Sequence, residues 1–201
     1  NAKAVVVDGN NIDGVFNSAI LLEGTTSGNV AVTNNVLTDW GKDIAGKGRA
    51  IRIVKGEGTT ATITGNAMMH DNAPEEFVKV SSNTENVNIN ENYWNGNNPV
   101  ETAGLYDVLN VYPENYYSEY ENGELKNLVT LSYAAQIGAA KYTTLQNAVN
   151  AVKDGEEIVL LRDITENVTL TEKAGLKYTI NGASKTMNGN IKIKALSETN
   201  D

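Results

Sequence analysis

Side chains that could do chemistry are gathered in two turns of the repeat described below. Asp39 is expected in one turn, and His70 and Asp71 in the next. Asp43 and Arg49 lie in the long loop that follows Asp39. A carboxyl group that donates a proton beside a second carboxylate hydrolyses glycosidic bonds, and clustered carboxylates bind calcium. Solvated polar loops explain the same residues without chemistry. We therefore keep Asp39, His70 and Asp71 as catalytic candidates and Asp43 and Arg49 as binding candidates, with calcium as the only cofactor that they suggest.

Tyrosines crowd the segment from residue 106 to residue 133, where glutamates are interleaved with them. Tyrosine rings stack on the apolar faces of sugars, so Tyr116 and Tyr117 could form a binding platform. The alternative is structural: terminal segments of repeat proteins cover the last repeat and bury its apolar face. We predict that residues 113–135 form this cap or linker.

The elements that would position these residues are indicated by a repeated asparagine. Asn10, Asn35, Asn66 and Asn92 are separated by 25, 31 and 26 residues. This period suits one turn of a strand solenoid with loops of varying length. A buried asparagine at each bend could bond the backbone of its own turn and the amide of the next. The spacing therefore predicts a structural asparagine ladder in an all-β, single-stranded parallel β-helix.

Flanking apolar residues support this stacking. A large apolar residue lies two positions after each asparagine. A second segment occurs three times, and in each copy its side chains are expected to point inward, outward and inward in turn. The first set is Ile12, Leu37, Met68 and Trp94. The second consists of Ile20, Ile51 and Val78, then Leu21, Arg52 and Lys79, then Leu22, Ile53 and Val80. An antiparallel sandwich of short strands is the alternative, because alternation alone does not exclude it.

Composition limits the classes of partner. The 201 residues carry a formal net charge of −9 and include no cysteine. An acidic protein is repelled by nucleic acid and by anionic membranes, so we expect neither as a partner. The absence of cysteine excludes disulfides, thiolate metal sites and cysteine nucleophiles. No apolar run is long enough to insert in a membrane. Because the chain begins with Asn1 within a repeat, we expect it to be part of a longer polypeptide.

A second unit is predicted at residues 136–201, after a first unit of β-helical coils at residues 1–112. Residues 143–146 have the form of a capping box, and Leu145, Ala148, Val149 and Val152 lie on one helical face. The pattern predicts a helix near residues 143–153. Short strand candidates separated by glycines follow it. We expect the helix to be the N-terminal cap of a second, short β-helical unit.

Two resemblances add to this interpretation. Residues 141–149 and 154–164 resemble a recurrent module of large exported surface proteins of gut bacteria. The first part of the chain resembles the right-handed β-helix superfamily that includes pectate lyases, and residues 92–96, Asn-Tyr-Trp-Asn-Gly, resemble an ending common in that superfamily. These resemblances imply a right-handed β-helix in a secreted or cell-surface bacterial protein with an adhesin-like role.

The resemblance to pectate lyases does not extend to a complete catalytic set. Residues 52–55, Arg-Ile-Val-Lys, only approximate the arginine-isoleucine-lysine motif of the hydrolases, and His70 has no flanking glycines. We therefore predict a non-catalytic surface segment that serves as a scaffold or binds a glycan or a host protein. A fragment of a carbohydrate-active enzyme, either a polysaccharide lyase or a glycoside hydrolase, and an inert spacer are the alternatives.

Overall fold

The computed structural model describes residues 4–24, 28–41, 48–55, 58–71, 76–102, 104–171 and 175–194. These residues form strands and one short helix, so the protein is mostly β. The chain divides into two compact units, which we call unit 1 (Asn1–Leu131) and unit 2 (Ser132–Asp201). Within the described residues, no helix is long and apolar enough to cross a membrane.

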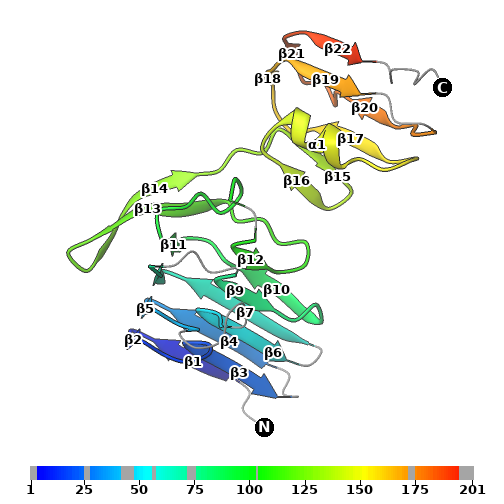
Figure 1. Cartoon of the computed structure of the whole chain (residues 1–201). Coiled ribbons are helices and arrows are strands. Elements are labelled where there is room, and N and C mark those ends of the chain that lie inside the picture. Colours follow the sequence, from blue (N-terminus) through cyan, green and yellow to red (C-terminus); the bar gives the residue numbers. More distant parts are fainter. Residues whose placement is uncertain are drawn as a thin grey trace, which may run out of the picture. The chain divides into compact units, whose positions relative to one another are not determined.

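Unit 1 is built from three sheets that the chain visits in turn (Figure 1). Sheet A contains β1 (Ala4–Asp8), β4 (Gly28–Thr33), β7 (Thr59–Thr64) and β10 (Thr84–Asn88). Sheet B contains β2 (Asn11–Asp13), β5 (Val36–Thr38), β8 (Ala67–Met69), β11 (Tyr93–Trp94), β13 (Asn115–Glu121) and β14 (Glu124–Thr130). Sheet C contains β3 (Ile20–Gly24), β6 (Ile51–Lys55), β9 (Val78–Val80) and β12 (Tyr106–Asp107). We call one passage through sheets A, B and C a circuit.

Equivalent strands of successive circuits pair in parallel. The column of Ile12, Leu37, Met68 and Trp94 is in register, which confirms the predicted inward stack. The columns that begin at Ile20, Leu21 and Leu22 are in register as well. Only the β13–β14 pair of unit 1 is antiparallel, so the described strands do not form the alternative sandwich.

The interior of unit 1 is apolar and contains a run of aromatic rings. Trp40 packs edge-on against Phe77 with ring centroids 5.1 Å apart, Phe77 lies 6.3 Å from Trp94, and Trp94 lies 6.0 Å from Tyr106. Trp40, Phe77 and Trp94 are all essentially inaccessible to solvent. These rings join successive circuits through their side chains, in addition to the backbone pairing.

The bend between sheets A and B is held by the repeated asparagines. The Nδ2 atom of Asn35 donates to Oδ1 of Asn66 at 2.9 Å, and Nδ2 of Asn66 donates to Oδ1 of Asn92 at 3.0 Å. Asn10 donates to Asn35 in the same way. Asn35, Asn66 and Asn92 are fully buried, and each Nδ2 also donates to a backbone oxygen of the preceding circuit. The side chains therefore satisfy the polar groups of an irregular buried bend.

The strands β13 and β14 form a hairpin that extends sheet B. Tyr117 of β13 pairs with Tyr93 of β11, and this register places Tyr116 beside Asn92, where a further ladder asparagine would stand. The hairpin turns at Asn122 and Gly123, whose φ angles are 55° and 81°. Positive φ at both central residues is the signature of a type I′ turn, which Asn-Gly favours.

Unit 2 repeats the three-sheet path on a smaller scale. Its sheets contain β16 (Ala140–Tyr142), β15 (Ala135–Ile137), β17 (Glu157–Leu160) and β20 (Thr179–Asn181), then β18 (Ile164–Thr165) and β21 (Met187–Asn188), then β19 (Val168–Thr171) and β22 (Ile191–Lys194). The β17, β18 and β19 strands pair in parallel with β20, β21 and β22. Two successive passages through the same three sheets are therefore described.

The helix of unit 2, α1 (Leu145–Ala151), packs against the start of this path. Its N-cap is Thr144, whose side chain accepts a hydrogen bond from the Asn147 amide at 3.1 Å, and not Thr143 as the capping-box pattern predicts. Gln146 bonds the backbone of Thr169 instead of the helix: its Oε1 accepts from Thr169 N at 2.7 Å and its Nε2 donates to Thr169 O at 3.1 Å. Gln146 therefore pairs with β19 as a neighbouring strand would.

Candidate functional site

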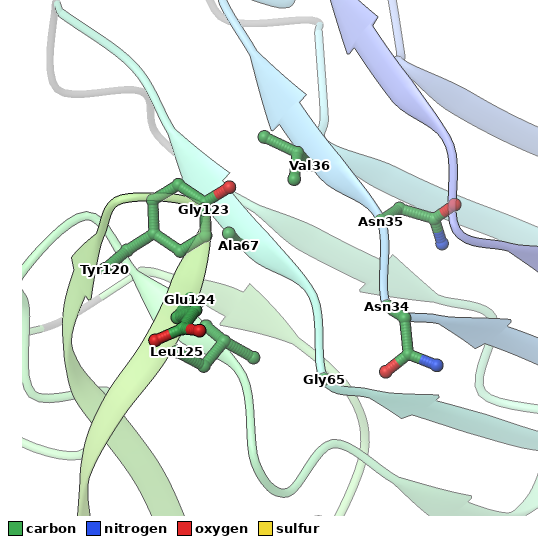
Figure 2. Close-up of a pocket in the computed structure, with 9 residues that line it drawn as sticks. All are labelled: Asn34, Asn35, Val36, Gly65, Ala67, Tyr120, Gly123, Glu124 and Leu125. Carbon is green, nitrogen blue, oxygen red and sulfur yellow. The ribbon is translucent and has the colours of Figure 1, made fainter.

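A groove of about 360 Å³ lies between the hairpin tip and the outer face of sheet B, within unit 1 (Figure 2). One side is formed by residues 34–36, Gly65 and Ala67 from two successive circuits. The other side is formed by Tyr120 and residues 123–125 of the hairpin. This volume falls within the range of about 300–1,000 Å³ that is usual for small-molecule sites.

The floor of the groove is set by side-chain size on the outer face of sheet B. Val36, Ala67 and Tyr93 are in register there, one in each of three successive circuits. Ala67 is the small residue between two larger ones, so it leaves a depression beneath the hairpin. Leu125, which pairs with Tyr120 across the hairpin, adds apolar surface on the opposite side.

The hairpin wall is held by an aromatic contact. The ring of Tyr120 lies 6.1 Å from the ring of Tyr93, with the two planes inclined by 33°. In Figure 2 the Tyr120 ring stands beside Ala67. Glu124 pairs with Glu121, so its side chain lies on the opposite, exposed face of the hairpin from Tyr120 and Leu125. A salt bridge of 2.9 Å between Lys126 and Glu121 also ties the two strands together near the tip.

The polar rim of the groove offers a hydrogen-bond acceptor. The Nδ2 atom of Asn34 donates to Asp8 at 2.9 Å, and Oδ1 faces Gly65, where an added Cβ would lie only 2.5 Å away. Hydrogen bonds from Thr33 and Asn34 lower the pKa of Asp8, which favours its charged form. The amide nitrogen of Asn34 is thus occupied, and its oxygen points towards Gly65 on the groove side.

The catalytic candidates lie at the end of sheet B in adjacent circuits. The Asp39 amide donates to Met69 O at 3.2 Å, which places Asp39 beside His70. The Nε2 atom of His70 lies 2.7 Å from Trp40 O, and its ring packs edge-on against Trp40 at 5.1 Å. Asp71 is exposed to solvent. His70 is thus engaged in structural contacts at this bend.

The binding candidates outside the tyrosine segment have a different position. Arg49 forms a 2.6 Å ion pair with Glu76 and donates from Nη1 to Gly48 O. Lys79 pairs with Asp107 at 2.6 Å and lies 3.9 Å from Glu76. These contacts link successive circuits at sheet C, away from the groove under the hairpin. Asp43 lies outside the described residues.

The tyrosine candidates do not line the groove. Tyr116 is 8% exposed and packs in the core, so its ring offers no face to a sugar. Burial, followed by the charge of Glu101, raises its pKa. Tyr117 is half-buried beside Tyr93. The tyrosine that does line the groove is Tyr120, and the Asn122-Gly123 pair was the signal in the sequence that could have revealed its hairpin.

The acidic and histidine side chains are spread over the structure. Within the described ranges, no group of three or more His, Cys, Asp or Glu residues could hold a metal ion. Asp39 and His70 are adjacent but do not form part of such a group.

Comparison of the chain with models of protein families, with curated proteins and with solved structures gave no match.

Proposed function

We propose that both units are right-handed parallel β-helices. Support comes from the order of the strands: successive strands enter three sheets in turn, and equivalent strands pair in parallel from one circuit to the next. The resemblance to the pectate-lyase-like superfamily supports the right-handed sense. On this proposal α1 and the β15–β16 hairpin cover the first circuit of unit 2, as terminal caps of repeat proteins do.

We propose that the protein is a non-catalytic segment of a secreted or cell-surface bacterial protein, and that it binds a glycan through unit 1. The observation that carries this proposal is the groove with an aromatic wall beneath the β13–β14 hairpin. An aromatic ring beside a few polar groups is the arrangement with which proteins bind sugars. The circuits of unit 1 supply a rigid support for this site.

The structural contacts of one catalytic candidate also support a binding function over hydrolysis. His70 contacts Trp40 through both its ring and its Nε2 atom. This side chain therefore contributes to the bend between circuits.

Binding to a glycan array, measured with the 201-residue chain in the presence and absence of calcium, tests this function. We expect the protein to bind a defined set of glycans, and we expect the Tyr120→Ala variant not to bind them. Binding that survives Tyr120→Ala would move the site away from the groove. A blank array would contradict the proposed function and favour a spacer, and release of sugar ends from the bound glycan would favour an enzyme.

A further inference from the structure

The side-chain amide of Asn34 is held in one orientation at the rim of the groove. Its Nδ2 atom donates to a carboxylate oxygen of Asp8 at 2.9 Å, and the Thr33 hydroxyl donates to the same oxygen at 2.6 Å. These hydrogen bonds lower the pKa of Asp8, so its carboxyl group is ionised and only accepts. A flipped amide would place two acceptors against each other. The nitrogen of Asn34 therefore stays at Asp8, and its oxygen stays on the groove side.

Gly65 leaves room for this oxygen. A Cβ atom at Gly65 would lie 2.5 Å from Oδ1 of Asn34, and the φ angle of +69° at Gly65 also favours glycine. Asn34 is exposed to solvent, and among the described residues no donor reaches its Oδ1. The rim thus presents an acceptor of fixed position that a ligand can use.

The groove floor does not supply backbone donors to a ligand. The backbone N–H groups of the floor residues all donate within unit 1; these residues are Asn34, Asn35, Val36, Gly65 and Ala67. A carboxylate or sulfate group accepts hydrogen bonds and does not donate them. Such a group would meet the oxygen of Asn34 and the negative charge of Asp8 at the rim, and it would find no free N–H at this floor. The groove therefore disfavours uronates and sulfated sugars.

In the described part of the groove, no charged side chain faces the ligand space. Glu124 belongs to the lining, but it pairs with Glu121 across the hairpin, so its side chain lies on the face opposite Tyr120 and Leu125. The groove side carries the half-buried Tyr120 ring and the apolar side chains of Val36 and Leu125. An ammonium group would lose water here without a carboxylate to pair with, which costs free energy. The ligand that fits is uncharged, has an apolar face and donates a hydrogen bond.

We propose that this groove binds an uncharged sugar residue and that Asn34 is the residue that selects it. The apolar face of the sugar ring packs against Tyr120, and a ring hydroxyl donates to Oδ1 of Asn34. Asp8 is a positioning residue, because it holds the Asn34 amide and does not touch the sugar. This assignment rests on the proposed glycan-binding function and narrows its ligand to neutral glycans.

The test is calorimetric titration of the 201-residue chain at mildly acidic pH, where uronates are charged and amines are protonated. The probes are oligosaccharides of glucose, galactose and mannose, their uronate counterparts, glucosamine oligosaccharides, and any neutral glycan that the array identifies. We expect at least one neutral oligosaccharide of the panel to bind about tenfold or more tightly than its uronate counterpart, because the carboxylate is repelled by Oδ1 of Asn34 and by Asp8. Added salt should narrow this difference, since it screens the charge of the exposed Asp8.

Two variants and one matched control locate the selectivity. Asn34→Gly removes the acceptor without backbone strain, because glycine readily adopts the φ of 55° found at Asn34, and it should weaken binding of the neutral oligosaccharide about tenfold. Asp8→Asn keeps the size of the side chain but lets the Asn34 amide turn its nitrogen to the groove, so the preference for neutral over uronate ligands should fall about threefold or more. Asp13→Asn is the control: Asp13 also accepts from a threonine of the next circuit but does not line the groove, and both values should stay unchanged.

The outcomes separate this inference from the proposed function. Equal affinity for neutral and uronate ligands, tighter binding of glucosamine than of glucose oligosaccharides, or unchanged affinity in Asn34→Gly would overturn the assignment while glycan binding stands. Array hits that are all charged glycans would overturn it as well. A preference that is unchanged in Asp8→Asn would refute the positioning role of Asp8. A blank glycan array together with no binding of any saccharide probe would overturn both the assignment and the proposed function.

Discussion

Asn66 takes part in five hydrogen bonds through its side chain at the centre of unit 1. Its Oδ1 accepts from the backbone and side chain of Asn35, and its Nδ2 donates to Val32 O, Thr64 O and Asn92 Oδ1. Asn35, Asn66 and Asn92 are fully buried, so water does not reach their side chains. The asparagine therefore satisfies donors and acceptors that the backbone geometry of the bend leaves open.

Replacing Asn66 with alanine should lower the free energy of unfolding of unit 1 by about 3 kcal/mol, since several buried polar groups lose their partners together. Urea unfolding followed by tryptophan fluorescence measures this, because Trp40 and Trp94 are the only tryptophans and both lie in unit 1. Asn83→Ala, in an exposed turn, is the control and should change stability by less than about 0.5 kcal/mol. Equal effects of the two substitutions would contradict a structural ladder.

Tyr106 gives unit 1 a sensitivity to alkaline pH. Burial, with a contribution from neighbouring Tyr112, raises its pKa to about 12. The unfolded chain releases the phenolic proton at lower pH than the folded one, so stability falls as the pH rises from about 10 towards 12. Phenolate absorbance should contain a component that ionises near 12 and is lost in Tyr106→Phe. An unchanged titration in that variant would refute the assignment.

Residue spacing alone predicted where the asparagines stand, but not which tyrosine faces the groove. The ladder is periodic in sequence, so one asparagine predicts the next. Tyr116 and Tyr120 both belong to a segment with no period, and their faces depend on where the hairpin begins and how it folds over sheet B. Tyr116 falls beside Asn92 and is buried, whereas Tyr120 falls opposite Ala67 and lines the groove.

At the scale of elements, Gln146 connects α1 to β19. One edge of β19 pairs with β22, and among the described residues no strand pairs with its other edge. The side-chain amide of Gln146 pairs with both N and O of Thr169 at this other edge. Glu166 also accepts a hydrogen bond from the Leu145 amide at the start of α1. The helix thus covers the strand edge that would otherwise expose unpaired backbone groups.

Gln146→Ala should lower the free energy of unfolding of unit 2 by about 2 kcal/mol, because the backbone N–H and C=O of Thr169 both lose their hydrogen-bond partner. Hydrogen exchange of the Thr169 amide measures the effect directly, and this amide should lose its protection. Asn147→Ala removes an exposed side chain on the neighbouring position and should leave Thr169 protected. Retained protection in Gln146→Ala would show that the helix, and not this side chain, covers the strand.

The capping-box pattern identified the helix but displaced its start by one residue. Thr143 and Thr144 are both suitable N-caps, so local sequence does not choose between them. Contact with β19 determines which threonine is the N-cap. The Gln146 side chain bonds the backbone of Thr169, so it is not available to bond the amide of Thr143 as a capping box requires. For the hairpin of unit 1 the local sequence is sufficient to predict the turn, because Asn-Gly favours type I′. The position of the hairpin over sheet B is not predicted by the local sequence.

At the scale of the whole molecule, each unit has its own apolar core. Unit 1 buries Leu37, Ile53 and Ile63 among others, and unit 2 buries Leu145, Ile158 and Ile164. A unit with its own core can unfold as a separate cooperative transition.

Gly189→Ala should therefore lower the melting temperature of unit 2 and leave that of unit 1 unchanged. Gly189 has a φ of +148°, and a Cβ there would lie 1.9 Å from Glu166 O, so the substitution forces the backbone to move. Gly182→Ala is the matched control, since its Cβ would make an ordinary 3.7 Å contact. Calorimetry resolves the two transitions, and tryptophan fluorescence reports unit 1. A fall in both transitions would show that the units unfold together.

The order of the strands and the division into two units were predicted from the sequence, because both are reflected in periodic residue patterns. No periodic pattern predicts the groove. It forms because Ala67 stands between Val36 and Tyr93 and because a hairpin some fifty residues later returns to the same face. Such a meeting of distant segments is a property of the folded chain.

The ladder asparagines of unit 1 and two polar side chains of unit 2 link successive circuits in opposite directions along the chain. In unit 1 the amide of the earlier circuit donates to the asparagine of the next, as Asn35 N does to Oδ1 of Asn66. In unit 2 the oxygen belongs to the earlier circuit: Asp163 accepts a hydrogen bond from Thr186 N, and Asn167 accepts one from Asn190 N. During synthesis the ladder amides of unit 1 therefore lack these partners until the next circuit emerges, whereas Asp163 and Asn167 offer acceptors to the residues that follow them.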